Sequence, residues 1–212
     1  MIIQPDIEAY LNKMVSRPPS VVEEMEQYAA QKRFPIAGPL VGKFLQLMVR
    51  TSRAKNILEC GGGFGYSAVW MAEVLPDDGK IVSIDYSEDN AARGTAYLKK
   101  AGHSKKVQFL SGDVMALLPQ MNEWYDLIFN DVDNHFYPEL LPLILPKLKP
   151  GGMLITDNVL WRAKVVGENP DNTTRAVLQY NEMLHQSPEL ETSILPLRDG
   201  LAISIKQLHA KD

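Results

Sequence analysis

A glycine-rich segment at positions 59–65 is the first part of the sequence whose residues could do chemistry. It reads Glu-Cys-Gly-Gly-Gly-Phe-Gly, with glycines at the alternate positions 61, 63 and 65. Glycine lets the backbone approach a ligand closely, because no Cβ stands in the way. Asp85 ends the next expected strand, where a carboxylate can accept hydrogen bonds from both hydroxyls of a ribose. The segment is close to a dinucleotide-binding fingerprint but is not one, since G-x-G-x-x-G would need a glycine where Tyr66 stands.

A second set of polar residues, Asp131, Asp157 and Asn158, follows two later expected strands. Two carboxylates and one amide oxygen suit a hard cation, Mg²⁺ first and Ca²⁺ or Mn²⁺ next. Three protein ligands leave positions for water and for two oxygens of a substrate such as a vicinal diol, whose hydroxyl pKa the cation would lower. Acidic residues are also common in solvated loops at strand ends. The spacing alone therefore fits a cation site and a hydrated rim equally well.

The elements that must position these residues alternate between strand and helix from residue 55 onward. Strands are expected at 56–60, 80–84, 107–110, 124–129 and 153–156, and helices at 66–75, 88–101, 114–121, 137–148 and 173–186. The last two expected strands, 190–196 and 201–206, are joined by a turn too short for a parallel crossover, so they form an antiparallel hairpin. The pattern predicts an α/β, Rossmann-like fold: a seven-stranded, mostly parallel sheet with helices on both faces and this C-terminal hairpin. Ligands of such sheets bind beyond the carboxyl ends of the strands, where the polar residues above would meet.

The first 52 residues are expected to be helical, with helices at 7–15, 21–31 and 40–51. Ser20 is placed to cap the second of them, as Ser87 is for the helix that runs to 101, where Gly102 suits the position after the end. At 212 residues, the chain is expected to be a single domain over 1–212, with residues 1–52 as an N-terminal helical extension.

The composition narrows the class of protein. Hydrophobic residues make up 45% and charged residues 23%, which is ordinary for a globular protein and excludes general disorder. A net charge of −4 without a basic cluster argues against nucleic acid as a partner. The sequence has no apolar run long enough to span a membrane and no signal-peptide pattern at its start. The single cysteine, Cys60, gives no intrachain disulfide, and a cytoplasmic location is expected.

The run at 59–67, Glu-Cys-Gly-Gly-Gly-Phe-Gly-Tyr-Ser, resembles the cofactor loop of class I S-adenosylmethionine-dependent methyltransferases. Its Gly-Tyr-Ser ending is similar to that of the catechol and caffeoyl-CoA O-methyltransferase family. Further matching motifs follow in the family's order: Asp85, Gly112-Asp113-Val114, Asn158-Val159-Leu160-Trp161 and Asp199-Gly200-Leu201. The resemblance implies a cation-dependent enzyme that transfers a methyl group from S-adenosylmethionine to a hydroxyl of a small-molecule acceptor, such as a diol or catechol-like compound. Members of the family often form homodimers, and the apolar N-terminal helices would suit a dimer interface, although the same helices could instead cap the sheet.

The resemblance further implies which residues bind which group. The expected cofactor-binding residues are Ala37, Glu59, Gly61, Gly63, Tyr66, Ser67, Asp85, Tyr86, Gly112, Asp113, Val114 and Asp131. Asp131, Asp157 and Asn158 would be the protein ligands of the divalent cation. Residues 34–37 lie where relatives close over the methionine end of the cofactor, and Trp161 and Arg162 are placed to wall the acceptor pocket.

The sequence departs from the family at two positions. Relatives carry a lysine after the fourth strand, as the base or its electrostatic helper, whereas this chain has Asn134. An asparagine cannot accept a proton at neutral pH. The neighbouring His135 could, since its intrinsic pKa lies near 6.5, although an exposed histidine and ionisation by the metal alone are the alternatives. Asp131, Asn134 and His135 are therefore the candidate catalytic residues. Gly62 replaces a threonine of many relatives, so one hydroxyl contact to the cofactor is expected to be missing.

Other functions compete with cation-dependent methyl transfer. A metal-independent methyltransferase, or a non-catalytic S-adenosylmethionine-binding module that lost its chemistry with the lysine, would carry the same glycine loop. A nicotinamide-dependent oxidoreductase is disfavoured by Tyr66 at the third glycine position and by the lack of a convincing Tyr-x-x-x-Lys proton donor.

Overall fold

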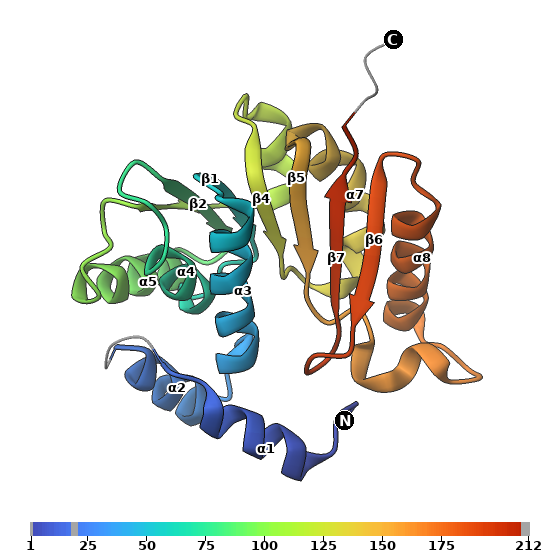
Figure 1. Cartoon of the computed structure of the whole chain (residues 1–212), viewed down its shortest axis with the longest axis horizontal. Coiled ribbons are helices and arrows are strands. Elements are labelled where there is room, and N and C mark those ends of the chain that lie inside the picture. The colour runs from blue at the N-terminus through green and yellow to red at the C-terminus, as the bar shows by residue number, and fades with distance from the viewer. Residues whose placement is uncertain (1, 18–20, 209–212) are drawn as a thin grey trace.

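Seven strands form one mixed sheet in the order β3-β2-β1-β4-β5-β7-β6 (Figure 1). The structure is a computed structural model that describes residues 2–17 and 21–208. The strands are β1 (Asn56–Cys60), β2 (Lys80–Asp85), β3 (Val107–Ser111), β4 (Tyr125–Asn130), β5 (Leu148–Thr156), β6 (Leu190–Leu195) and β7 (Leu201–Lys206). The first five pair in parallel, and β7 runs antiparallel between β5 and β6. The predicted Rossmann-like fold with its C-terminal hairpin is confirmed.

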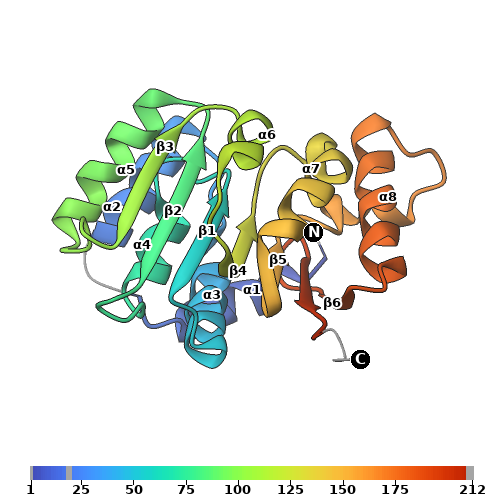
Figure 2. The ribbon, with the colours of Figure 1, turned by 90° about the horizontal axis from the view of Figure 1, so that it is seen from above.

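Helices cover both faces of the sheet. They are α1 (Pro5–Met14), α2 (Val21–Lys32), α3 (Gly38–Ser52), α4 (Tyr66–Ala72), α5 (Glu88–Lys100), α6 (Val114–Leu117), α7 (Tyr137–Ile144) and α8 (Asn172–Gln186). One core joins the sheet to α2, α3, α4 and α5, with Met25 and Val69 fully buried in it. The other joins it to α6, α7 and α8, with Leu140 and Tyr180 fully buried. Figure 2 shows α5 and α8 at opposite ends of the sheet.

The local start and stop residues act as expected where the structure describes them. The Ser87 hydroxyl caps α5 by accepting a hydrogen bond from the Asn90 backbone N–H. Gly102, just past the end of α5, has a φ of +82°, a conformation that glycine adopts without steric cost. The expected cap Ser20 lies outside the described residues.

Several predicted boundaries were wrong, and proline explains two of them. The expected helix 114–121 ends as α6 at residue 117 and continues as a 3₁₀ turn, Leu118–Gln120, that contains Pro119. The expected helix 137–148 ends at Ile144, and a 3₁₀ turn with Pro146 follows, because proline has no N–H to donate to the preceding turn. Strand β5 begins at Leu148, before the expected start at 153, because Leu148 already pairs with Tyr125 across a register shift.

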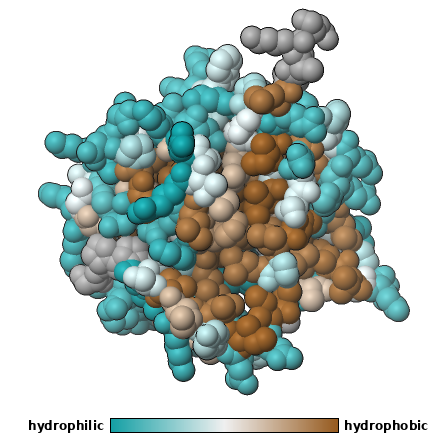
Figure 3. Space-filling view, viewed as in Figure 1, coloured by the Kyte–Doolittle hydropathy of each residue, from teal (hydrophilic) through white to brown (hydrophobic). Residues whose placement is uncertain are grey.

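Apolar side chains gather on the face of the molecule seen in Figure 1, as the space-filling view in Figure 3 shows. Phe44 and Met48 of α3 and Ile203 and Ile205 of β7 are only half-buried. Helix α1 has no buried residue. The homodimer stays a prediction.

Within residues 2–17 and 21–208, no helix is both long enough and apolar enough to cross a membrane.

Candidate active site

A cleft of about 1420 Å³ lies where β1, β2, β4 and β5 reach their carboxyl ends. Most of the predicted site residues line it: Ala37, Gly61, Gly63, Tyr66, Ser67, Asp85, Tyr86, Gly112, Asp113, Val114, Asp131, Asn134, Asp157 and Asn158. Glu59 and His135 are the two predicted residues that are not on its wall. The parallel strands thus bring residues from positions 37 to 158 into one cavity, as their placement after strand ends predicts.

The glycine loop between β1 and α4 packs directly against the end of β4. The Gly61 backbone has a φ of +87°, and a Cβ at this position would clash with the Asp131 backbone carbonyl. The Gly61 N–H donates to the carbonyl of Ile84 at 2.9 Å, which ties the loop to β2 as well. Only glycine fits here, so the close packing of the loop places its backbone beside Asp131.

Glu59 is fully buried beneath this loop rather than exposed in the cleft. Its carboxylate accepts hydrogen bonds from the hydroxyls of Ser67 and Ser83. Burial raises the pKa of Glu59, and the two hydroxyls oppose that rise. A side chain at Gly62 would clash with the Ser83 hydroxyl, so Ser83 fills the space that a threonine at position 62 would need. In the structure, Glu59 supports the loop from below.

Asp85, at the end of β2, is held in place by three hydrogen-bond donors. Its Oδ2 accepts from the Gly63 N–H at 2.9 Å. Its Oδ1 accepts from the Ser87 N–H at 2.9 Å and from Asn90 Nδ2 at 3.0 Å. Asn90 also lines the cleft, and the sequence analysis missed it, although its place one turn after the Ser87 cap could have indicated it. Tyr86 stands 80% exposed at the rim beside Asp85.

Asp131 and Asp157 lie side by side at the other end of the cleft. They follow β4 and β5, whose last residues, Asn130 and Thr156, are partners in register. Burial, and the negative charge of Asp157, raise the pKa of Asp131 well above its usual range. Burial raises the pKa of Asp157 to about 6, although the Asn158 N–H donates to its Oδ1 at 2.7 Å. A cation bound between the two carboxylates would stabilise the ionised form of both.

The donor set at this end fits a divalent cation of the hard class. It consists of the carboxylates of Asp131 and Asp157 and the side-chain oxygen of Asn158, which all line the cleft. The described residues contain no group of three or more His, Cys, Asp or Glu that could hold a metal. A cation at this end would therefore take its third protein ligand from an amide oxygen, that of Asn158.

Comparison with known proteins matches residues 13–207 to the O-methyltransferase family. The chain belongs to this family. The catechol O-methyltransferase of Niastella koreensis is 34% identical to it over 177 residues, which are 79% of this chain and 80% of the relative. The caffeoyl-CoA O-methyltransferase 2 of Petunia hybrida is 32% identical over 203 residues, 88% and 84% of the two chains. An O-methyltransferase from Bacillus cereus, solved in complex with SAH, superposes with a TM-score of 0.87 at 27% identity, covering 95% of this chain and 97% of that one.

In this O-methyltransferase, Asn134 and His135, the two candidate catalytic residues after Asp131, differ in position. Asn134 is buried, and its Nδ2 donates to the backbone carbonyl of Asn158 at 3.2 Å, so it holds a candidate metal ligand in place. His135 is exposed, and its ring lies tilted against that of Phe136, with ring centroids 3.9 Å apart. Because His135 is absent from the cleft wall, the geometry gives no support to its role as the base.

The far wall of the cleft contains strained backbone and an arginine that sequence analysis missed. Trp161, Arg162 and Ala163 have φ values of +43°, +54° and +61°, and the first two line the cleft as expected. Arg198, in the turn between β6 and β7, lines it as well, and its charge lowers the pKa of both Asp131 and Asp157. Nothing in the sequence distinguished Arg198 from an ordinary turn residue.

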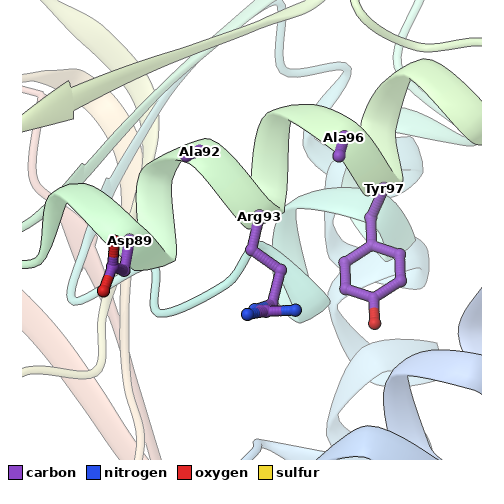
Figure 4. A pocket seen from close by; sticks show the side chains of 5 residues that line it. All are labelled: Asp89, Ala92, Arg93, Ala96 and Tyr97. Carbon is purple, nitrogen blue, oxygen red and sulfur yellow. The ribbon is translucent and has the colours of Figure 1, made fainter.

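A second hollow runs along one side of α5 (Figure 4). It is lined by Asp89, Ala92, Arg93, Ala96 and Tyr97, which all belong to that one helix. The Arg93 guanidinium also lies 4.3 Å from the centre of the Tyr28 ring of α2, a cation–π contact. It includes none of the predicted site residues.

Proposed function

We propose that this chain transfers a methyl group from S-adenosylmethionine to a hydroxyl of a small diol or catechol-like acceptor, with a divalent cation held by Asp131, Asp157 and Asn158. The observation that carries the proposal is that the glycine loop and the acidic pair share one cleft, with Gly61 packed on the backbone of Asp131. Membership of the family, the names of the relatives and the SAH-bound neighbour support the reaction and the cofactor.

The cofactor would lie along the glycine loop from β2 towards β4. Asp85, already oriented by three donors, would accept the ribose hydroxyls, while Tyr86 and Val114 would flank the adenine. The backbone of Gly61 and Gly63 would approach the cofactor closely, and residues 34–37 would cover its methionine end. The methyl carbon would then lie near Asp131, where the acceptor binds.

The acidic pair would hold the divalent cation and, through it, position the acceptor. When bound, the divalent cation would supply two positions for diol oxygens and lower the pKa of the hydroxyl that is methylated. Asn134 holds the backbone of Asn158, and so fixes one ligand. The residues that line the cleft include no lysine and no histidine, so neither of these side chains is available there as a base. Methyl transfer is a displacement at carbon, and the main task of these residues is alignment.

The test is a methyl-transfer screen on the purified chain with S-adenosylmethionine, Mg²⁺ and a panel of diols, read by mass spectrometry. We expect at least one acceptor to gain the mass of one CH₂ unit, and no gain with acceptors whose hydroxyls are all methylated beforehand. Product formation in metal-free buffer would instead indicate a metal-independent methyltransferase. Tight SAH binding without methylation of any diol would contradict the proposal and favour a non-catalytic binding module.

A further inference from the structure

Arg198 connects the C-terminal hairpin to the N-terminal helices. Its Nη1 donates to the backbone carbonyl of Ile36 at 2.9 Å and also to that of Ala37. Its Nε lies 3.9 Å from Oε1 of Glu8 in α1. The side chain is only 35% exposed, so these contacts are partly shielded from water. One guanidinium therefore ties the β6–β7 turn to the α2–α3 connection and, more loosely, to α1.

The backbone on both sides of this contact fits the guanidinium. Gly38 has a φ of +79°, and a Cβ there would lie 2.8 Å from Arg198 Nη1. Arg198 itself has a φ of +50°, a conformation that a residue with a side chain seldom adopts. Strain of this kind persists only where the surrounding contacts compensate for it. The two carbonyls that accept from the guanidinium are those contacts.

The segment that Arg198 holds extends to the glycine loop. Phe34 packs edge-on against Phe64 of the loop, with ring centroids 5.0 Å apart, and its ring lies 3.3 Å from the place of a Cβ on Gly63. The segment 34–37 thus touches the cofactor loop at one end and Arg198 at the other. The Arg198 side chain also lines the same cleft as Asp131 and Asp157.

We propose that Arg198 is a positioning residue for methyl transfer: by fixing segment 34–37 to the β6–β7 turn, it sets the methyl end of the cofactor relative to the acceptor at the acidic pair. This inference rests on the proposed function. A displacement reaction needs the nucleophile, the methyl carbon and the sulfur in line, and a misplacement of about 1 Å can cost about 10²-fold in rate. The arginine therefore acts through segment 34–37 rather than on the reacting atoms.

Three substitutions distinguish the role of the Arg198 side chain from that of its backbone conformation. Arg198→Met removes the donors and keeps much of the length of the side chain. Arg198→Gly removes the side chain and suits the φ of +50°, so it keeps the turn intact even if the methionine variant folds poorly. Arg198→Lys keeps the charge but has no planar fork to reach both carbonyls. The matched control is Arg175→Met, because Arg175 Nη1 also donates to a backbone carbonyl, that of Pro170, outside the cleft.

The first measurement is amide hydrogen exchange, which needs no turnover. We expect faster exchange in residues 34–38 in Arg198→Met and Arg198→Gly, with unchanged exchange in β2 and no change in Arg175→Met. The second measurement is steady-state kinetics on an acceptor found in the screen, together with the Kd of SAH. We expect kcat to fall about tenfold or more while the Kd changes by less than about threefold, with partial recovery in Arg198→Lys.

The outcomes separate the two proposals. Unchanged exchange in segment 34–38, or an unchanged kcat in both the methionine and the glycine variants, would overturn the role of Arg198 while leaving the proposed function intact. An equal loss of kcat and SAH affinity would also overturn it, because Arg198 would then serve cofactor binding alone. If the wild-type chain methylates no diol, the proposed function fails instead, whatever the exchange shows.

Discussion

The two ends of the cleft differ in how their polar groups are satisfied. At the cofactor end, Asp85 has three donors within the protein and the buried Glu59 has two hydroxyls. At the acidic end, burial raises the pKa of both Asp131 and Asp157. The backbone at 161–163 adopts left-handed conformations there. The first end is organised by internal hydrogen bonds. The second end keeps two buried carboxylates whose negative charge a cation would neutralise. A reaction that needs an ionised hydroxyl is therefore expected at this end.

The largest effect should come from the acidic end. We expect Asp157→Ala to lower kcat by about 10³-fold or more, because the loss of a ligand removes the cation whose stabilisation of the ionised acceptor is worth several kcal/mol. SAH binding, measured by calorimetry, should be largely retained, since Asp157 lies away from the donors around Asp85. An Asp157→Ala enzyme with normal turnover would contradict the assignment of the acidic end.

The reverse pattern is expected at the cofactor end. Asp85→Ala should weaken S-adenosylmethionine binding at least tenfold, because hydrogen bonds to a charged group contribute about 1.5–3 kcal/mol each. The control is Asp89→Ala on neighbouring α5. Asp89 lines the hollow along α5 rather than the cleft, so this variant should bind the cofactor normally. Unchanged affinity in Asp85→Ala, measured by calorimetry, would remove this carboxylate from the cofactor site and erase the contrast between the two ends.

The raised pKa of Asp157 should be measurable as a pH dependence of the free energy of unfolding. The pKa of Asp157 in the folded protein, about 6, exceeds the value of about 3.9 in an unfolded chain, so the folded state binds this proton more tightly. Its contribution is present below about pH 4 and is lost as the pH rises through about 6. In EDTA, Asp157→Asn should therefore gain about 1–3 kcal/mol of unfolding free energy over wild type at pH 7 and much less at about pH 4.5. Urea denaturation at both values checks this, and an equal difference at both would show that Asp157 ionises normally.

The smallest effect is expected at His135. Because it is exposed and outside the cleft wall, His135→Gln should change kcat and its pH profile little. A loss of about 10²–10⁴-fold, the usual range for a general base, would show that it reaches the site in the working enzyme.

Asn134→Lys offers a sharper companion test. It should raise activity towards simple catechols, because it adds a cation near the developing phenolate.

Sequence predicted the cleft better than it predicted the contacts within it. Parallel strands place their carboxyl ends at one edge, so the alternation of strands and helices was enough to predict that Asp85, Asp131 and Asp157 lie along one cleft. The roles of Glu59 and Arg198 were not. Glu59 faces Ser83 because β1 and β2 pair in that register, and a register is fixed only when the sheet forms.

Arg198 illustrates a different limit. Its hydrogen bonds reach carbonyls that lie 161 and 162 residues earlier in the chain, and no local pattern encodes a contact between a turn and so distant a backbone. The predicted ends of two helices were wrong for a simpler reason. Pro119 and Pro146 were visible, but whether a proline kinks a helix or converts it to a 3₁₀ turn depends on the packing around it.

The most direct test of the account is metal removal from the wild-type enzyme. The protein would be treated with EDTA, desalted and assayed with S-adenosylmethionine and the best diol from the screen, before and after addition of Mg²⁺, with SAH affinity measured in both states. We predict that turnover is abolished without metal and restored by Mg²⁺, while SAH affinity is little changed. Full activity in the metal-free preparation would contradict the account, and would show that Asp131, Asp157 and Asn158 form a hydrated rim rather than a cation site.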